Sequence, residues 1–267
     1  MASTLAIYAR VVGSRLRGQF SYRLSFFLQI IGASLLSSLD FVVILVIFVH
    51  LPRLANWTLP EIAFLYGTSY VPFRFGDMTM GNLDRLPLFI RMGSFDQVMT
   101  RPLGTLAQVL TSEIDVRHIG GMFQGAFVLV YAFRHVSVHW DALHIVVLVS
   151  MAISAYVIFA SIWVATNAIA FWTMDAREVA NSVTYGGNNI TQYPMSIYGV
   201  WMRRLFGYVI PLAFVNYYPS LFLLGKTDPA HSPSILRFLS PAVAVASVVV
   251  AGVIWRLAVR HYRCTGS

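Results

Sequence analysis

Three ionisable side chains lie inside stretches that are otherwise apolar enough to cross a membrane. Arg74 and Asp77 are three residues apart, so on a helix they share one face and can form an ion pair. Asp40 lies in the preceding apolar stretch. A charged group at the bilayer centre costs about 2.5–3.5 kcal/mol on insertion scales, so such residues face a partner or a water-filled cavity. These three can pair structurally, within or between helices, or they can contact a substrate or an ion.

A second set of polar and aromatic residues could line a substrate path. Trp163 and Asn167 lie about one turn apart in a strongly apolar stretch, and desolvated aromatic faces attract organic cations. Tryptophan near the end of a helix can instead anchor it at the membrane interface. Four further polar residues make the stretch 178–197 unusually polar for a membrane span: Asn181, Tyr185, Asn188 and Gln192. Either this helix lines a wet substrate path or it is not a span.

A short polar island between apolar stretches has the character of a docking element. Asp96 could cap the start of a short helix, and Phe95, Val98 and Met99 could offer an apolar face to a groove on a soluble partner. Arg101 would then meet acidic residues or phosphates. The alternative is an ordinary surface loop whose apolar side chains dip into lipid. The docking prediction covers Ser94, Phe95, Asp96, Val98, Met99, Arg101 and Pro102, where the proline ends the helix.

The composition places these residues in an integral membrane protein. The 267 residues are 57% hydrophobic and 11% charged, whereas soluble domains have about 25% charged residues. The longest apolar runs are long enough for helices, which need about 20 residues to span a bilayer, and this favours helices over a barrel. The net charge of +8 is explained by topology and lipid attraction, so no nucleic-acid partner is expected.

The sequence argues against chemistry catalysed by this chain itself. Neither a His-Glu-x-x-His nor a Gly-x-Ser-x-Gly motif is present, and the single Cys264 fits no zinc-ligand spacing. His135 and His139 are four apart, but the valines between them indicate an extended turn. We therefore expect no catalytic residue, metal or cofactor in this chain.

The hydropathy pattern predicts an all-α polytopic membrane protein that forms one transmembrane domain over residues 1–267. A basic amphipathic helix at 1–23 would lie on the membrane surface. The predicted spans are 24–49, 62–83, 108–133, 143–171, 178–197 and 239–259, with a re-entrant hairpin at 198–224 before the sixth span. The alternative makes 198–224 the fifth span, and both arrangements give six crossings. Basic residues on the inner loops place both termini inside.

Two segments resemble the membrane subunits of ABC type 2 exporters. Phe95 to Leu103 is similar to the first coupling helix of that family, in which a short hydrophobic run ends in a basic residue, a proline and an apolar residue. The second segment combines Tyr193-Pro194-Met195-Ser196-Ile197-Tyr198 with Ile210 to Pro219 and Leu223-Leu224-Gly225, and it resembles one subfamily of these permeases.

This resemblance implies a function that needs partner subunits. A coupling helix at 93–103 would bind an ATP-binding cassette subunit, which would hold ATP and Mg²⁺ and hydrolyse the nucleotide. A second permease, in this subfamily often a different protein, would complete a heterodimer in the cytoplasmic (inner) membrane. The complex would export an amphipathic or drug-like substrate. The alternative is a self-contained secondary transporter or channel using Asp40, Arg74 and Asp77, although the chain lacks the internal repeat of many such carriers.

Overall fold

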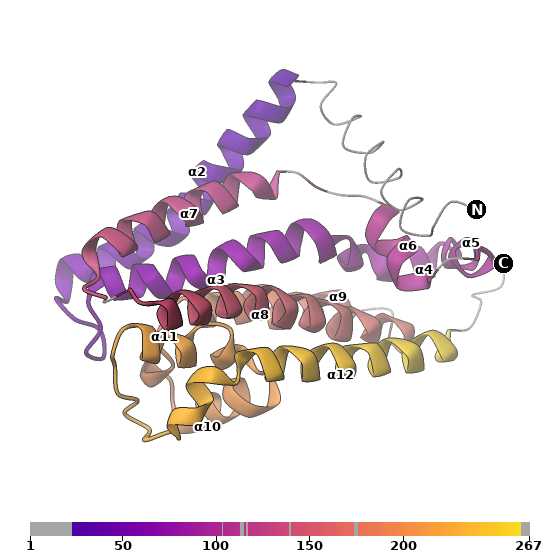
Figure 1. The fold of residues 1–267 in the computed structure, drawn as a ribbon. Helices are drawn as coiled ribbons and strands as arrows, with labels where there is room; N and C mark the ends of the chain where they lie inside the picture. Colours follow the sequence, from indigo (N-terminus) through magenta and orange to yellow (C-terminus); the bar gives the residue numbers. More distant parts are fainter. Residues whose placement is uncertain are drawn as a thin grey trace.

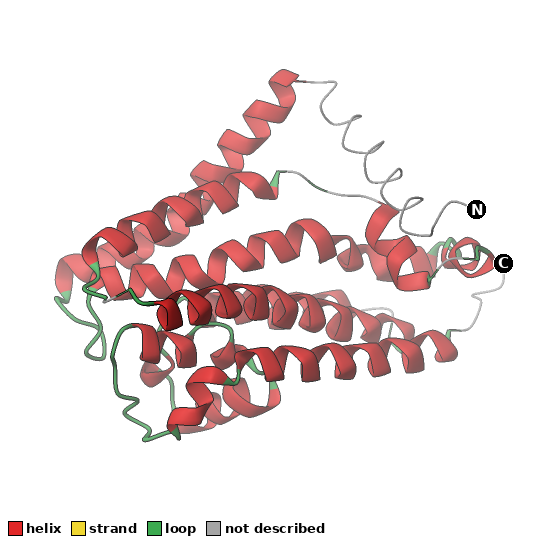
Figure 2. Cartoon of the chain, viewed as in Figure 1, coloured by secondary structure: helices red, strands yellow, loops and turns green. Residues whose placement is uncertain are grey.

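The computed structural model describes residues 23–102, 104–112, 115, 117–138, 140–173 and 176–262. Of the described residues 81% are helical, and this part of the chain contains no β-strand. Figure 2 shows the helices joined by turns and loops. The predicted surface helix at 1–23 lies almost wholly outside the described residues, as do Leu103, His139 and Cys264. The all-helical prediction is confirmed.

Six longer helices form the body of the molecule (Figure 1). They are α2 (Arg23–His50), α3 (Leu59–Met80), α7 (His118–His135), α8 (Ala142–Asn167), α9 (Ala176–Thr191) and α12 (Ser240–His261). Helix α3 is central, with α7 and α8 against it, while α2 packs on α7 and α12 packs on α8. The helices that bury most of α3 thus come from both halves of the chain.

Short elements occupy the two ends of this bundle. At one end, here called the α5 end, lie α4 (Leu86–Arg91), α5 (Phe95–Thr100) and α6 (Thr105–Ser112), after the 3₁₀ turn η1 (Gly81–Arg85). At the opposite end, called the α10 end, lie α10 (Val200–Arg204) and α11 (Tyr217–Leu223). Between these two come the π-helix η4 (Leu205–Val209) and the turn η5 (Leu212–Phe214). The remaining 3₁₀ turns are η2 (Ala168–Phe171), η3 (Met195–Ile197) and η6 (Ser234–Phe238).

Glycines let α7 approach its neighbours closely. A Cβ atom at Gly120 would overlap the carbonyl oxygen of Ile30 on α2. A Cβ at Gly125 would lie 3.0 Å from the ring of Tyr70 on α3, and one at Gly67 would lie 2.7 Å from Leu129 Cβ. Small residues at helix interfaces allow such close packing inside membranes. These positions fix α7 between α2 and α3.

Three helical segments are long and apolar enough to cross a membrane on their own: Phe26–His50, Ala142–Phe171 and Ser240–His261. The segments Val200–Val209 and Leu212–Leu223 form a bent pair with an angle of 75° at the Ile210-Pro211 break, which fits either a broken span or a re-entrant loop. The six-crossing topology therefore stays a prediction. Within the described residues the predicted span at 108–133 corresponds to two helices, α6 ending at Ser112 and α7 beginning at His118, and its crossing of the membrane stays a prediction.

Candidate functional site: an exposed hairpin and a buried polar cluster

Helices α4 and α5 form a tight hairpin at one end of the bundle. Gly93 has φ +65°, a left-handed conformation that glycine adopts without strain, and it reverses the chain between the two helices. The Ser94 hydroxyl donates to the carbonyl oxygen of Phe89 on α4 at 3.1 Å. Gln108 of α6 donates to the carbonyl oxygen of Val98 at 2.9 Å. The hairpin is thus held at its turn and from the following helix.

Phe95 anchors this hairpin inside the protein, which corrects its predicted role as a docking side chain. Its side chain is completely buried, and its ring packs edge-to-face on Phe171 and Tyr262 with centroid distances of 5.0 and 4.9 Å. Asp96 is not the N-cap of α5, since Ser94 holds that position, and the Asp96 carboxylate accepts a hydrogen bond from Tyr262 Oη at 2.8 Å. These two residues therefore tie α5 to the ends of α8 and α12.

Other apolar side chains of the hairpin are exposed. Met92 is 68% exposed and Met99 is 48% exposed, while Leu88 also projects outward and Val98 is half-buried. Arg101 and Pro102 are exposed beyond the end of α5. We call Leu88, Met92 and Met99 the hairpin patch. Flexible methionines next to basic side chains suit recognition of a groove with an acidic rim.

A buried polar cluster lies where α3 passes into η1. Asp77, 3% exposed, is its centre. Arg74 Nη1 donates to Asp77 Oδ2 at 3.2 Å, and His118 Nδ1 lies 3.1 Å from the same oxygen. Tyr185 Oη lies 3.0 Å from Asp77 Oδ1 and 3.2 Å from Asp84 Oδ2. One phenol therefore bridges two carboxylates, and four elements meet at this point.

Trp163 and Asn167 belong to the same cluster and do not form an open aromatic wall. Both are buried, and Trp163 Nε1 and Asn167 Nδ2 donate to Asp84 Oδ1 at 3.0 and 3.2 Å. Burial raises the pKa of the Asp84 carboxyl, and neighbouring Asp77 acts in the same direction. The hydrogen bonds from Trp163, Asn167 and Tyr185 oppose this rise. These two residues of α8 thus hold Asp84 in place.

Asp40 joins this cluster indirectly. Arg74 Nη2 donates to Tyr70 Oη at 2.5 Å, and Tyr70 Oη in turn donates to Asp40 Oδ2 at 3.4 Å. The guanidinium of Arg74 also lies 4.7 Å from the centre of the Tyr70 ring, within the range of a cation–π contact. Asp40 and Arg74 are therefore linked through a phenol instead of forming a direct ion pair.

Two of the predicted path residues, Asn188 on α9 and Gln192 just after it, face the interior, and Asn181 is half-buried. Asn188 and Gln192 are buried, and Asn188 Oδ1, Gln192 Nε2 and Asn181 Oδ1 have no hydrogen-bond partner among the described residues. Buried polar atoms in proteins are nearly always paired, with ordered water where protein groups do not suffice. This arrangement agrees with a wet path along α9, which stays a prediction. A cavity of about 230 Å³ begins at this side of the cluster, lined by Asp77, Asp84 and Tyr185 among others.

Sequence reasoning missed Asp84, His118 and Tyr70. Asp84 is seven residues after Asp77, which is two helical turns, so it shares the helix face of Asp77 when η1 continues α3. That spacing could have identified it. His118 approaches from another helix, and nothing in its sequence neighbourhood pairs it with Asp77. Among the described residues, no group of three or more His, Cys, Asp or Glu side chains could hold a metal ion.

Comparison with known proteins places the chain in a family. The model of a family described as ABC-2 family transporter protein matches residues 35–266, which is most of the chain. This chain belongs to the ABC-2 transporter permease family. No curated protein and no solved structure matches it. As an ABC-2 permease it is a multi-pass membrane subunit of a transporter, and such permeases generally work with ATP-binding cassette subunits.

Proposed function

We propose that this ABC-2 permease is the membrane-spanning subunit of an ATP-driven exporter for an amphipathic or drug-like substrate. A separate ATP-binding cassette subunit would bind the hairpin patch, and that subunit would hold ATP and Mg²⁺. The α5 end and both termini would face the cytoplasm, and the complex would lie in the inner membrane beside a second, non-identical permease. The observation that carries the proposal is an exposed apolar hairpin in a chain of this family.

The contacts of α5 supply a route for force from the partner into the membrane. A displacement of the hairpin would act on Phe171 and Tyr262 through the Phe95 ring, and so on α8 and α12. It would also act on η1, which directly precedes α4 and contains Asp84. Asp84 is hydrogen bonded to α8 and α9. The polar cluster would therefore move as a unit with the hairpin.

The same cluster weakens the case for a self-contained ion carrier. Asp40, Arg74 and Asp77 are linked to one another through Tyr70 and through their own ion pair. Charged groups that satisfy each other in this way stabilise helix packing at little cost in hydrocarbon. Their arrangement favours a structural role over a path for ions.

The test is copurification from the native host with measurement of ATPase activity. We expect an ATP-binding cassette protein to copurify with the wild-type chain and to be lost from the variant Met92→Ser plus Met99→Ser. The matched control is Ile235→Ser plus Leu51→Ser, which removes apolar side chains of similar exposure, 63% and 48%, away from the hairpin. Purification of the chain alone, with ATP-independent transport in liposomes, would overturn the proposal.

A further inference from the structure

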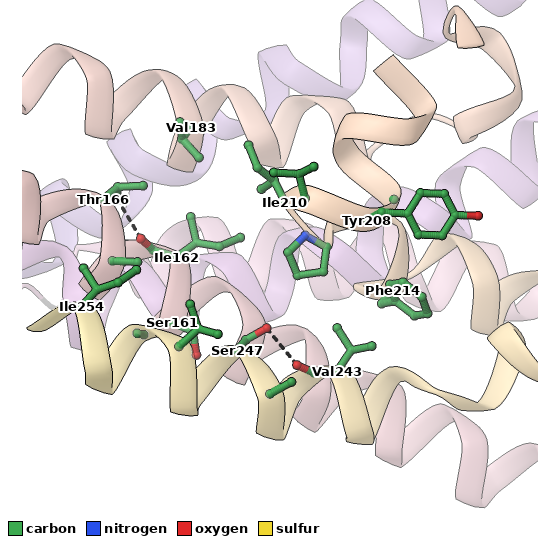
Figure 3. Close-up of a pocket in the computed structure, with 17 residues that line it drawn as sticks. Ser161, Ile162, Thr166, Val183, Tyr208, Ile210, Phe214, Val243, Ser247 and Ile254 are labelled. Atoms are coloured by element: carbon green, nitrogen blue, oxygen red, sulfur yellow. Dashed lines mark hydrogen bonds between the residues drawn. The ribbon is translucent and has the colours of Figure 1, made fainter. Parts of the chain in front are cut away.

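A long apolar groove runs between α8, α12 and the segment from η4 to η5 (Figure 3). Its volume is about 600 Å³, and side chains such as Ile162, Ile210 and Ile254 line it. The hydroxyls of Thr166 and Ser247, which also line it, donate to carbonyl oxygens of their own helices at 2.8 Å. Because these hydroxyl groups already donate to backbone carbonyls, the groove offers a ligand an almost purely apolar surface. It therefore suits a hydrocarbon chain.

The dimensions of this groove match one leaflet of a bilayer. Its lining on α12 runs from Val243 to Ile254, and at 1.5 Å per residue the eleven steps between them measure about 16 Å. The hydrocarbon core of a bilayer is about 30 Å thick, so this length corresponds to one leaflet. Val209 and Val250, on the rim, are exposed at the protein surface. An acyl chain could therefore enter from the side.

A second cavity adjoins the groove at the α10 end, and it has the opposite character. Its volume is about 370 Å³, and Tyr208 lines both cavities. Arg203 and Arg204 line only this second cavity, and neither guanidinium has a hydrogen bond or an ion pair within the described part of the chain. Two cationic groups thus lie at the mouth of an apolar groove.

The one carboxylate of this second cavity is already engaged. Asp228 accepts hydrogen bonds from Tyr217 Oη at 3.0 Å, from the Ala230 backbone N–H at 3.0 Å and from the Ser232 hydroxyl at 2.5 Å. With Asp228 held by neutral donors, the two arginines give the cavity a positive charge. An anionic group would be drawn to it.

We propose that the groove and the second cavity together bind one anionic phospholipid from the leaflet at the α10 end. The acyl chain would lie along α12, the phosphate would accept from Arg203 and Arg204, and Tyr208 would contact the lipid where head group and chain meet. Guanidinium forks match phosphate oxygens in geometry and charge. The π-helix η4, which contains Tyr208, is a distortion that is frequent at functional sites. A helix of another subunit in the groove would leave both arginines unneutralised.

The proposal does not depend on ATP-driven transport, and a direct binding measurement tests it. The detergent-purified complex is titrated with phosphatidylglycerol or phosphatidylcholine of equal chain length, and bound lipid is counted by native mass spectrometry. Each basic residue near a membrane surface contributes about fivefold in binding of acidic lipid. We therefore expect Arg203→Gln plus Arg204→Gln to weaken phosphatidylglycerol binding about 25-fold and to leave phosphatidylcholine binding unchanged.

The control removes two other basic residues, Arg53 in the loop after α2 and Arg237 in η6. Arg53→Gln plus Arg237→Gln changes the net charge equally at residues that do not line either cavity, so phosphatidylglycerol binding should stay at the wild-type level. Filling the groove with Ala246→Phe should weaken binding of both lipids. Equal wild-type affinity for the two lipids, or unchanged phosphatidylglycerol binding after loss of Arg203 and Arg204, would overturn the proposal. An unchanged melting temperature of the lipid-free arginine variant shows that it folds.

Discussion

Asp77 holds the buried polar cluster together, and Asp77→Asn should destabilise the protein strongly. The change removes the negative charge that compensates Arg74. It also places an amide group where Arg74, His118 and Tyr185 contact the Asp77 carboxylate in the wild type. Removing one partner of a buried ion pair costs about 3–5 kcal/mol. The Arg74 side chain keeps 20% exposure and its hydrogen bond to Tyr70, so we expect about 3 kcal/mol, the lower end of that range.

The assay is thermal unfolding of the detergent-solubilised protein. For a chain of this size a loss of 1 kcal/mol lowers Tm by about 2–4 °C, so the expected shift is about 6–12 °C. The matched control is Asp115→Asn, which breaks a largely exposed ion pair with Arg117 and a longer contact of 3.9 Å with His118, and leaves the Arg74–Asp77 pair intact. Surface pairs contribute about 0–1 kcal/mol. Equal shifts for the two variants would refute the reasoning that Asp77 is buried and central.

Three further predictions concern packing and pH. Gly120→Leu should lower Tm because its side chain would overlap the α2 backbone, while Gly32→Leu, with open space around its Cβ position, should not. Phe95→Ala should cost about 3–5 kcal/mol in unfolding free energy, as for other buried aromatic residues, whereas Phe123→Ala at a largely exposed site should cost far less; equal values would exclude the anchoring role of Phe95. Because the pKa of Asp84 is raised, the folded state binds the proton of this carboxyl more tightly than the unfolded state does. The contribution of Asp84 to the free energy of unfolding should therefore fall as pH rises above the ordinary pKa of 3.8. Asp84→Asn should remove this part of the pH dependence in melting curves recorded across that range, and an unchanged profile would contradict it.

The sequence predicted the elements whose formation depends on composition. The apolar stretches 24–49, 143–171 and 239–259 correspond to α2, α8 and α12, because hydrophobic length alone determines such helices. The third predicted span corresponds to two helices, α6 and α7, because polar residues separate its two apolar parts in the sequence. Whether 198–224 crosses the membrane depends on which helices surround its break at Pro211. The local sequence does not give that information.

The polar cluster was predictable only where its members are close in sequence. Arg74 and Asp77 share a helix face by spacing, and their ion pair follows from it. His118 and Tyr185 reach Asp77 from α7 and α9, and only the packing of the helices brings them there. An isolated titratable residue in an apolar stretch therefore indicates a partner without identifying it.

The hairpin illustrates a different limit. Its residue types indicated an apolar surface, but they could not separate the buried Phe95 from the exposed Met99. That separation depends on Tyr262 and Phe171, which come from the ends of other helices. Tests of docking should therefore change the hairpin patch and leave Phe95 intact.

Site-directed cross-linking from the hairpin would show whether an ATP-binding cassette protein binds there. The only cysteine of the chain is Cys264, so Met99→Cys in a Cys264→Ser background gives a single reactive position. The control position is Ile235→Cys in the same background. In native membranes, we expect a cross-link from position 99 to an ATP-binding cassette protein and none from position 235. No cross-link from position 99, or equal labelling from both positions, would contradict it.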